Sequence, residues 1–179
     1  MGKIVSNFFI SLDGVVESPH EWHFPYFDDA MGGAMEQGLQ STTAFLMGRK
    51  LYDEWSDYWP NNTEDDFGGF INPIPKYVLS STLTDPAWQN TTVISGDVVE
   101  GVQELKANTQ GTIGMSGCAT TVRWLLANGL LDELDLLVHP IAVGSGARLF
   151  EDTTTYPLTL LSSDTLPSGV LHVRYAPAS

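Results

Sequence analysis

Two turns in the sequence combine glycine with groups that bind phosphate. Gly48-Arg49-Lys50 follows the apolar run 43–47 and opens a short helical pattern. Ser116-Gly117 follows the apolar run 112–115, and apolar residues then recur at helical spacing as far as residue 128. A helix that begins where a strand ends presents unpaired N–H groups and its positive dipole end beyond the sheet, where phosphate commonly binds. Taken alone, the second turn is equally compatible with an ordinary connection between a strand and a helix.

A third strand end, at Ser80-Ser81, completes the candidate anion site. Arginine makes forked contacts to phosphate, serine hydroxyls donate to the remaining oxygens, and glycine lets a backbone approach a pyrophosphate closely. The combination suits a dinucleotide that carries an extra phosphate. Neither G-x-G-x-x-G nor the P-loop lysine motif is present, which argues against a standard Rossmann or kinase site. The candidate residues are Gly48, Arg49, Lys50, Ser80, Ser81, Ser116, Gly117, Cys118, Ala119 and Thr120.

Two acids are candidates for contact with a substrate. Asp13 follows the first strand pattern, 3–10. We expect it to face the crevice at the carboxyl ends of the strands, where it could hydrogen-bond an amine-bearing ring or relay a proton. A simple Asp-Gly turn explains the same residue equally well. For Asp28, the favoured interpretation is the N-cap of a helix that runs to about Gln40.

Other chemistry is less favoured by the spacing. The elbow-like sequence 114–118 ends in cysteine instead of glycine, which counts against a serine hydrolase. Cys118 lies on the apolar stripe of its helix, so a buried role is favoured over a nucleophilic one. His20 and His23 lack a third metal ligand, and His139 is expected to pack at a strand end. The acidic run 64–66 lacks the alternating ligands of a calcium loop, so no metal site is predicted.

Composition bounds the class of protein. A chain of 179 residues with 42% hydrophobic residues suits one domain, spanning 1–179. The net charge of −14 argues against nucleic acid or an anionic membrane as a partner. A single cysteine excludes an internal disulfide framework. With no secretory pattern and no apolar run of about 18 residues, we expect a cytoplasmic protein.

The order of elements predicts an α/β sheet. Strand and helix patterns alternate up to 134–138, after which strands follow one another, so we expect about eight mainly parallel strands with helices on both faces and an antiparallel C-terminal edge. The segments 15–27 and 60–73 are interpreted as loops. The apolar strands 134–138 and 170–175 are compatible with a covered core or with the edge of a homodimer. The remaining strands are expected at 43–47, 76–80, 91–95, 112–115 and 158–161, and helices at 28–40, about 49–55, 98–107 and 118–128.

Several stretches resemble the dihydrofolate reductase-like superfamily, and within it the RibD C-terminal domain group of bacterial reductases. They are Ser11-Leu12-Asp13-Gly14, Leu46-Met47-Gly48-Arg49-Lys50-Leu51-Tyr52-Asp53, Val78-Leu79-Ser80-Ser81-Thr82-Leu83, Met115-Ser116-Gly117-Cys118-Ala119, Gly129-Leu130-Leu131-Asp132-Glu133-Leu134 and the segment 139–150. The resemblance spans almost the whole chain and implies a three-layer fold that binds NADPH. It implies that Gly48, Arg49, Ser80 and Ser81 lie by the adenosine 2′-phosphate, and that 116–120 hold the pyrophosphate and the nicotinamide side.

Two departures from the family pattern bear on function. Leu51 stands where related reductases often have threonine, and Asp28 matches the substrate acid of dihydrofolate reductases only after a shift of one residue, although Trp22 and Pro25 are similar to the loop before it. The sequence therefore does not favour folate reduction. We expect a reductase that moves a hydride from NADPH to a C=N or C=O bond of a small pteridine-like or aminopyrimidine-like heterocycle, with Asp13 catalytic and Asp13, Trp22 and Asp28 binding substrate. The alternative is a non-catalytic ligand-binding protein that retains the fold.

Overall fold

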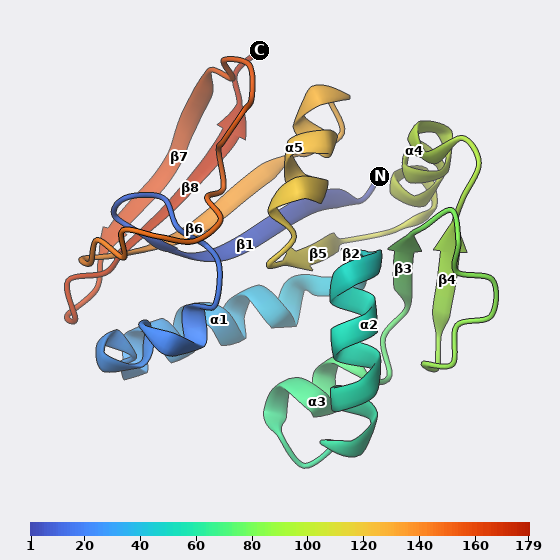
Figure 1. Ribbon diagram of the computed structural model, residues 1–179, viewed down its shortest axis with the longest axis horizontal. Helices are drawn as coiled ribbons and strands as arrows, with labels where there is room; N and C mark the ends of the chain where they lie inside the picture. The colour runs from blue at the N-terminus through green and yellow to red at the C-terminus, as the bar shows by residue number, and fades with distance from the viewer.

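The computed structural model describes residues 1–179 and shows one eight-stranded sheet between two layers of helices (Figure 1). The spatial order of the strands is β4-β3-β2-β5-β1-β6-β8-β7. The strands are β1 Lys3–Ser11, β2 Thr42–Gly48, β3 Lys76–Leu79, β4 Thr91–Ile94, β5 Thr112–Ser116, β6 Glu133–His139, β7 Leu158–Thr165 and β8 Leu171–Pro177. The helices are α1 Asp29–Ser41, α2 Arg49–Tyr58, α3 Asp66–Ile71, α4 Val98–Asn108 and α5 Ala119–Ala127, with 3-10 turns η1 Pro19–Glu21, η2 Phe24–Tyr26 and η3 Trp59–Asn61.

The direction of the strands confirms the predicted mixed sheet. The six strands from β4 to β6 are mutually parallel, and β8 and β7 add to β6 as an antiparallel hairpin. β6 and β8 both lie inside the sheet, so neither is an open sheet edge; the edges are β4 and β7. A homodimer stays a prediction. None of the helices combines the length and apolarity needed to cross a membrane.

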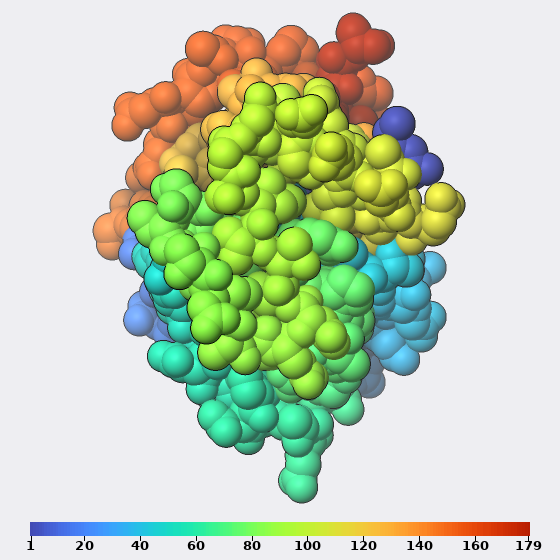
Figure 2. Space-filling view, turned by 90° about the vertical axis from the view of Figure 1, so that its right-hand side faces the viewer, coloured from blue at the N-terminus to red at the C-terminus, as the bar shows by residue number.

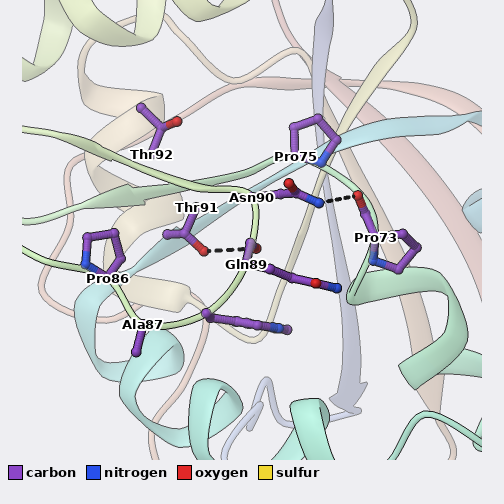
Figure 3. A pocket seen from close by; sticks show the side chains of 9 residues that line it. Pro73, Pro75, Pro86, Ala87, Gln89, Asn90, Thr91 and Thr92 are labelled. Atoms are coloured by element: carbon purple, nitrogen blue, oxygen red, sulfur yellow. Dashed lines mark hydrogen bonds between the residues drawn. The ribbon is translucent and has the colours of Figure 1, made fainter.

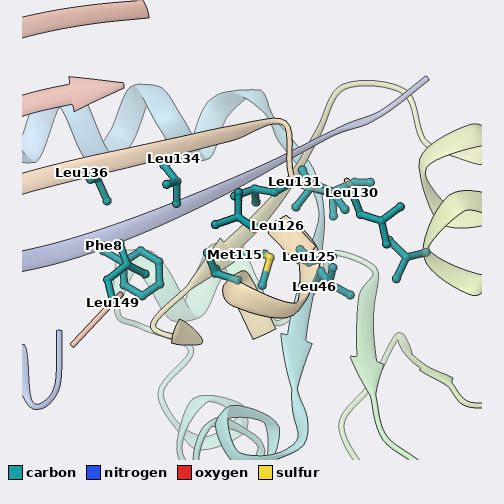
Figure 4. Packing of buried hydrophobic residues seen from close by; sticks show 14 of the residues in the cluster. Phe8, Leu46, Met115, Leu125, Leu126, Leu130, Leu131, Leu134, Leu136 and Leu149 are labelled. Atoms are coloured by element: carbon teal, nitrogen blue, oxygen red, sulfur yellow. The ribbon is translucent and has the colours of Figure 1, made fainter. Parts of the chain in front are cut away.

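The larger core lies between the sheet and the pair α4 and α5 (Figure 4). Alternate residues of the strands face these helices, as the twofold period of a strand requires. Leu46 and Met115 from neighbouring strands pack with Leu125 of α5, and each of the three is at most 1% exposed. This layer fixes where α5 begins relative to the carboxyl ends of β2 and β5.

The opposite face of the sheet carries two smaller cores. Phe45 and Met47 pack under α2 and α3, while Leu137 packs with Met31 of α1 and with the β7–β8 turn. Figure 2 shows the molecule from the side of the β4 edge. The green to yellow segment, which contains β3, β4 and α4, occupies the centre of this view, and the teal α2–α3 region lies below it. The chain therefore buries both faces of its parallel strands, as such sheets require.

Aspartate side chains cap three of the five helices. Asp28 accepts a hydrogen bond from Met31 N at 2.8 Å, which confirms its predicted role at the start of α1. Asp65 and Asp97 cap α3 and α4 in the same way. Helices α2 and α5 have no side-chain cap, and these are the two helices that begin at the candidate anion site.

The prediction that 60–73 forms only a surface loop is wrong. Helix α3 lies within it, with Ile71 fully buried. The glycines and acids of this segment suggested a turn, but Lys76 organises it: its buried ammonium donates to the carbonyl oxygens of Ile71, Asn72 and Ile74 at 3.0, 2.9 and 2.9 Å. Nζ also lies 4.6 Å from the centre of the Trp88 ring. A cation thus terminates α3, where the helix dipole favours positive charge.

Lys76→Met is expected to lower the free energy of unfolding by about 3 kcal/mol, because three buried carbonyl oxygens lose their donor. Urea unfolding followed by tryptophan fluorescence measures the change, and Lys50→Met, at an exposed lysine without an ion pair, is the control.

Burial lowers the pKa of Lys76 from 10.5 to about 8. Between these values the unfolded chain binds more protons, so the stability of the natural protein relative to the Met variant should rise from pH 8 to 10.5. A difference that stays constant across this window would contradict the assignment.

Candidate functional site

The two uncapped helices begin side by side at one edge of the sheet. β2 and β5 are neighbouring parallel strands, so their carboxyl ends deliver α2 and α5 to the same place. A Cβ atom at Gly48 would lie only 2.8 Å from Thr121 Oγ1, so glycine permits the close approach of the two helix starts. The structure therefore brings the two sequence-predicted turns into one site.

The second turn is open above α5. Gly117 has a φ of +66°, in the left-handed region that favours glycine, and no atom lies within 4 Å of the position that its Cβ would take. The first backbone hydrogen bond of α5 runs from Val122 N to Cys118 O, so the N–H groups of 119–121 have no acceptor. Backbone donors and free space together fit a pyrophosphate.

Cys118 itself is not placed to react. Its side chain packs between the two main cores, and burial raises the pKa of its thiol. The position fits the predicted buried role, in which only its backbone faces the turn.

Arg49 lies at the outer end of the site, against the turn that follows β3. Its Nε donates to Asp53 Oδ1 at 2.7 Å, and Nη1 donates to Thr82 Oγ1 at 3.1 Å. The Ser80 hydroxyl accepts from Thr82 N and Leu83 N, so it shapes this turn. Lys50 and Ser81, also predicted for this site, are exposed and make no side-chain hydrogen bond.

The sheet opens between β5 and β1. Their pairing ends at Asn7 and Ser116, whereas β1 continues to Ser11 along β6 alone. Residues 8–11 of β1 thus extend past the end of β5. We call the region beyond the end of β5, beside these residues, the crevice. From β1 the chain continues through α1 to β2 on one side of this gap, and from β5 it continues through α5 to β6 on the other side, which makes the gap the switch point where α/β sheets bind ligands.

Asp13 closes one end of this crevice by holding a distant loop. Its carboxylate accepts from Ser11 Oγ at 2.6 Å, Val143 N at 3.0 Å and Gly144 N at 2.8 Å. These bonds, that of Ser11 first, lower the pKa of Asp13 to about 2. A carboxylate that is already hydrogen-bonded and ionised is a weak proton donor, so the geometry favours positioning over proton relay.

Further contacts make this wall continuous. Glu17 Oε2 accepts from Ala147 N at 2.7 Å, and Arg123 of α5 donates to the carbonyl oxygens of Arg148 and Leu149 at 3.0 and 2.9 Å. Sequence patterns alone do not reveal these pairs, because the partners are about 130 positions apart or have unremarkable neighbours in the sequence. The contacts of Thr82 and Thr121 with the site were missed for the same reason. The contact of Asp53 with Arg49 was also missed, although their i, i+4 spacing is a recognisable helix pair.

The predicted substrate residues lie on the α1 side of the crevice. The Asp28 carboxylate accepts one hydrogen bond from Met31 N, as the N-cap of α1, and another from Ser168 N at 2.9 Å. Trp22 is buried, donates from Nε1 to Glu17 O, and meets the His139 ring edge-on. His139 is fully buried, which confirms that it packs at a strand end. Neither Trp22 nor Asp28 offers a free polar group to a ligand.

A separate surface pocket of about 540 Å³ lies elsewhere (Figure 3). It surrounds the amino ends of β3 and β4 and is shallow and open, with side chains such as Pro75 and Asn90 at its rim. Asn90 there donates to Pro73 O at 2.7 Å, so its polar groups serve the local turns. It is distinct from the carboxyl edge and contains none of the candidate residues.

Comparison with known proteins agrees with this geometry. The uncharacterized protein YyaP of Bacillus subtilis (strain 168) is 30% identical over 97% of this chain and 94% of its own length. A Shewanella sp. PV-4 protein assigned to riboflavin biosynthesis has a similar structure, with a TM-score of 0.75, 18% identity and 99% of both chains covered. Dihydrofolate reductase from Enterococcus faecalis, solved with NADP(H), has a TM-score of 0.63 at 13% identity over 99% of this chain and 98% of its own. The dihydrofolate reductase-like fold is thereby confirmed.

The RibD C-terminal domain model matches residues 2–172, which include the switch point, both helix starts and the Asp13 wall. This chain belongs to the RibD C-terminal domain family.

Proposed function

We propose that the protein is an NADPH-dependent reductase that delivers a hydride to a C=N or C=O carbon of a small heterocycle. The observation that carries the proposal is the convergence of two uncapped helix starts, at Gly48 and Cys118, beside the open switch point. The family is one of NADPH-dependent reductases, which supports the same cofactor. In the reaction the hydride bonds to the carbon, a proton bonds to the nitrogen or oxygen, and the oxidised product is NADP⁺.

The site residues have different proposed roles in binding the cofactor. The N–H groups of 119–121 and the Gly117 turn would hold the pyrophosphate, and Arg49 with Ser80 and Ser81 would face the 2′-phosphate. Lys50 is exposed nearby and adds positive charge. NADPH supplies the hydride when bound, and the chain supplies orientation and phosphate recognition. Since its carboxylate is occupied, Asp13 acts as a positioning residue that fixes the wall of the crevice.

Arg49→Ala should weaken NADPH binding by about 1.5 to 3 kcal/mol, the contribution of a hydrogen bond to a charged group, while NADH binding changes little. Titration followed by tryptophan fluorescence measures both. Arg174→Ala is a matched control, because that side chain is 42% exposed against 40% for Arg49 and lies on β8. Equal losses for both cofactors would remove Arg49 from the 2′-phosphate site. Cofactor binding without oxidation of NADPH by any heterocycle would favour the non-catalytic alternative.

Asp53→Asn is expected to strengthen NADPH binding about two- to fivefold at low salt, because Asp53 holds the guanidinium of Arg49 and adds negative charge beside it. The gain should shrink as salt is added and disappear in the double variant with Arg49→Ala. Asp57→Asn, one turn further along α2 and without an ion pair, is the control. If Asp53→Asn helps NADH equally, the effect is general electrostatics and Asp53 has no role in selecting the cofactor.

Asp13→Asn should lower the melting temperature at pH 7 and make residues 141–149 more open to proteolysis. The folded pKa of about 2 lies below the ordinary 3.8, so the contribution of Asp13 is full above pH 3.8 and declines as the pH falls towards 2. The melting temperatures of the natural protein and the variant should therefore converge in that window. For a positioning residue, the variant keeps the pH profile of kcat and loses rate through KM and kcat together, whereas a proton relay predicts a changed pH profile.

A further inference from the structure

The C-terminal hairpin of β7 and β8 is attached to the rest of the sheet through one strand. β8 pairs with β6 over 171–175, and β7 pairs with β8 alone. On the α5 side of the sheet the two strands pack Leu158, Val173 and Tyr175 against the large core. On the α1 side they contribute no residue to the core that lies there. Polar contacts take the place of apolar packing on that face.

Two pairs of opposite charge connect β8 to β6 on the α1-side face. Side chains alternate along β8, so His172 and Arg174 point away from the large core, and each reaches diagonally to an acid on β6. His172 Nε2 lies 2.7 Å from Asp135 Oδ1, and Arg174 donates from Nη2 to Glu133, which also accepts from Lys3 of β1. The side chains of Asp135 and Glu133 are 17% and 10% exposed, so salt screens these pairs little.

Only one of the two pairs changes its charge near neutral pH. The guanidinium of Arg174 keeps its proton throughout, whereas the imidazole of His172 titrates. The hydrogen bond to Asp135 raises the pKa of His172 above its ordinary value of 6.5, and the negative charges of Asp135 and Asp164 act in the same direction. Burial and the positive charge of Arg174 act against this shift.

The other charged groups around His172 are few. Asp164 of β7 lies opposite His172 in the hairpin. Glu133 of β6 is already bound by the two cations described above. On α1, the acids Asp29 and Glu36 are exposed to solvent. Asp135 is therefore the direct partner that decides how strongly a protonated imidazole is held.

The turn of the hairpin supports the first turn of α1. The Asp28 carboxylate accepts from Met31 N at 2.8 Å and from Ser168 N at 2.9 Å, so it joins the start of the helix to the turn. Leu166 and Val170, on either side of Ser168, pack with Met31 in one core. In Figure 1 the orange and red hairpin rises away from α1, and its turn is the end nearest the start of that helix. A movement of the hairpin therefore also moves the groups that fix the start of α1.

We propose that the His172–Asp135 pair makes the attachment of the β7–β8 hairpin, and through it the start of α1, sensitive to pH. With the imidazole protonated, the pair is ionic and holds the hairpin on β6. With the imidazole neutral, Nε2 still donates but the hydrogen bond is weaker, and the hairpin opens more often. Each opening separates Ser168 from Asp28 and so releases the first turn of α1. The device is a property of the fold and does not depend on the ligand that the protein binds.

The experiment measures amide hydrogen exchange of the full chain by NMR, corrected for the intrinsic pH dependence of exchange, from pH 6 to one unit above the His172 midpoint observed in the same samples. Because the folded pKa lies above 6.5, the contribution of His172 is complete below pH 6.5 and declines as the pH rises through the folded pKa. The amides of 171–175 should lose about fivefold in protection relative to those of 112–116 in β5, the difference between a charged and a neutral hydrogen bond. The amides of Ser168 and Met31 should lose protection in parallel. The amide of Glu100, which Asp97 caps at the start of α4, should not.

Three variants isolate the imidazole. His172→Gln keeps a donor for Asp135 without a charge, so the pH-dependent loss should disappear. Arg174→Gln removes the pair that does not titrate, so protection of 171–175 should fall at every pH and the pH-dependent loss should remain. His20→Gln, at an exposed histidine, should behave as the natural protein does. The opposite pH dependence expected of Lys76 is common to all four proteins and cancels in the comparison.

A pH-dependent loss at 171–175 that persists in His172→Gln would overturn the proposal. So would equal protection on the two sides of the His172 midpoint in the natural protein, a comparison that does not depend on the folding of any variant. A loss at 171–175 with unchanged protection at Ser168 and Met31 would overturn the connection to α1.

Discussion

The pairing of β1 sets the form of the site. This strand pairs with β5 over 3–7 and with β6 over 5–11, so its last four residues have a neighbour on one side only. The offset opens the switch point, places Phe9 and Asp13 on its rim, and brings His139 level with Ser11. The gap beside β1 and the start of α5 both depend on where β5 stops. A longer β5 would close the crevice.

The anion site depends more on backbone than on side-chain charge. Of the eight basic residues, Lys50 alone has no ionic or carbonyl partner, and Arg49 is shared with Asp53. In a protein of net charge −14, no side chain caps α5, so its first N–H groups remain available to an anion. The aspartates that cap α1, α3 and α4 would repel a phosphate if they stood at α2 or α5, so their absence from those two positions matters as much as any residue present. The partners of the other basic residues are Glu133 for Lys3 and Arg174, Asp132 for Lys106, Asp13 for Arg148, and carbonyl oxygens for Lys76 and Arg123.

Local patterns predicted most of the fold because its elements are locally consistent. Short apolar and β-branched runs predicted all eight strands to within a few residues, and Asp28 predicted the start of α1 because a cap acts within one turn. Helix α3 was missed although Asp65 caps it, because it has only six residues, two of them glycine, and because the three carbonyl oxygens that Lys76 binds at its end cannot be recognised from the local sequence. The candidate site could be predicted only in part: glycine and arginine indicated the anion side, but the role of Asp13 arises from partners far away in the chain.

The position of β1 also has a consequence for synthesis of the protein on the ribosome. The first strand to emerge has no neighbour in the sheet until residues 112–116 and 133–139 have been made. Until then Ile4 and Phe8 remain without most of the core that later buries them. β2, β3 and β4 can pair with one another earlier, since they are consecutive in the chain and adjacent in the sheet. The nascent chain must therefore hold an apolar N-terminal segment unpaired for more than half its length, a natural target for a chaperone that binds extended apolar peptides.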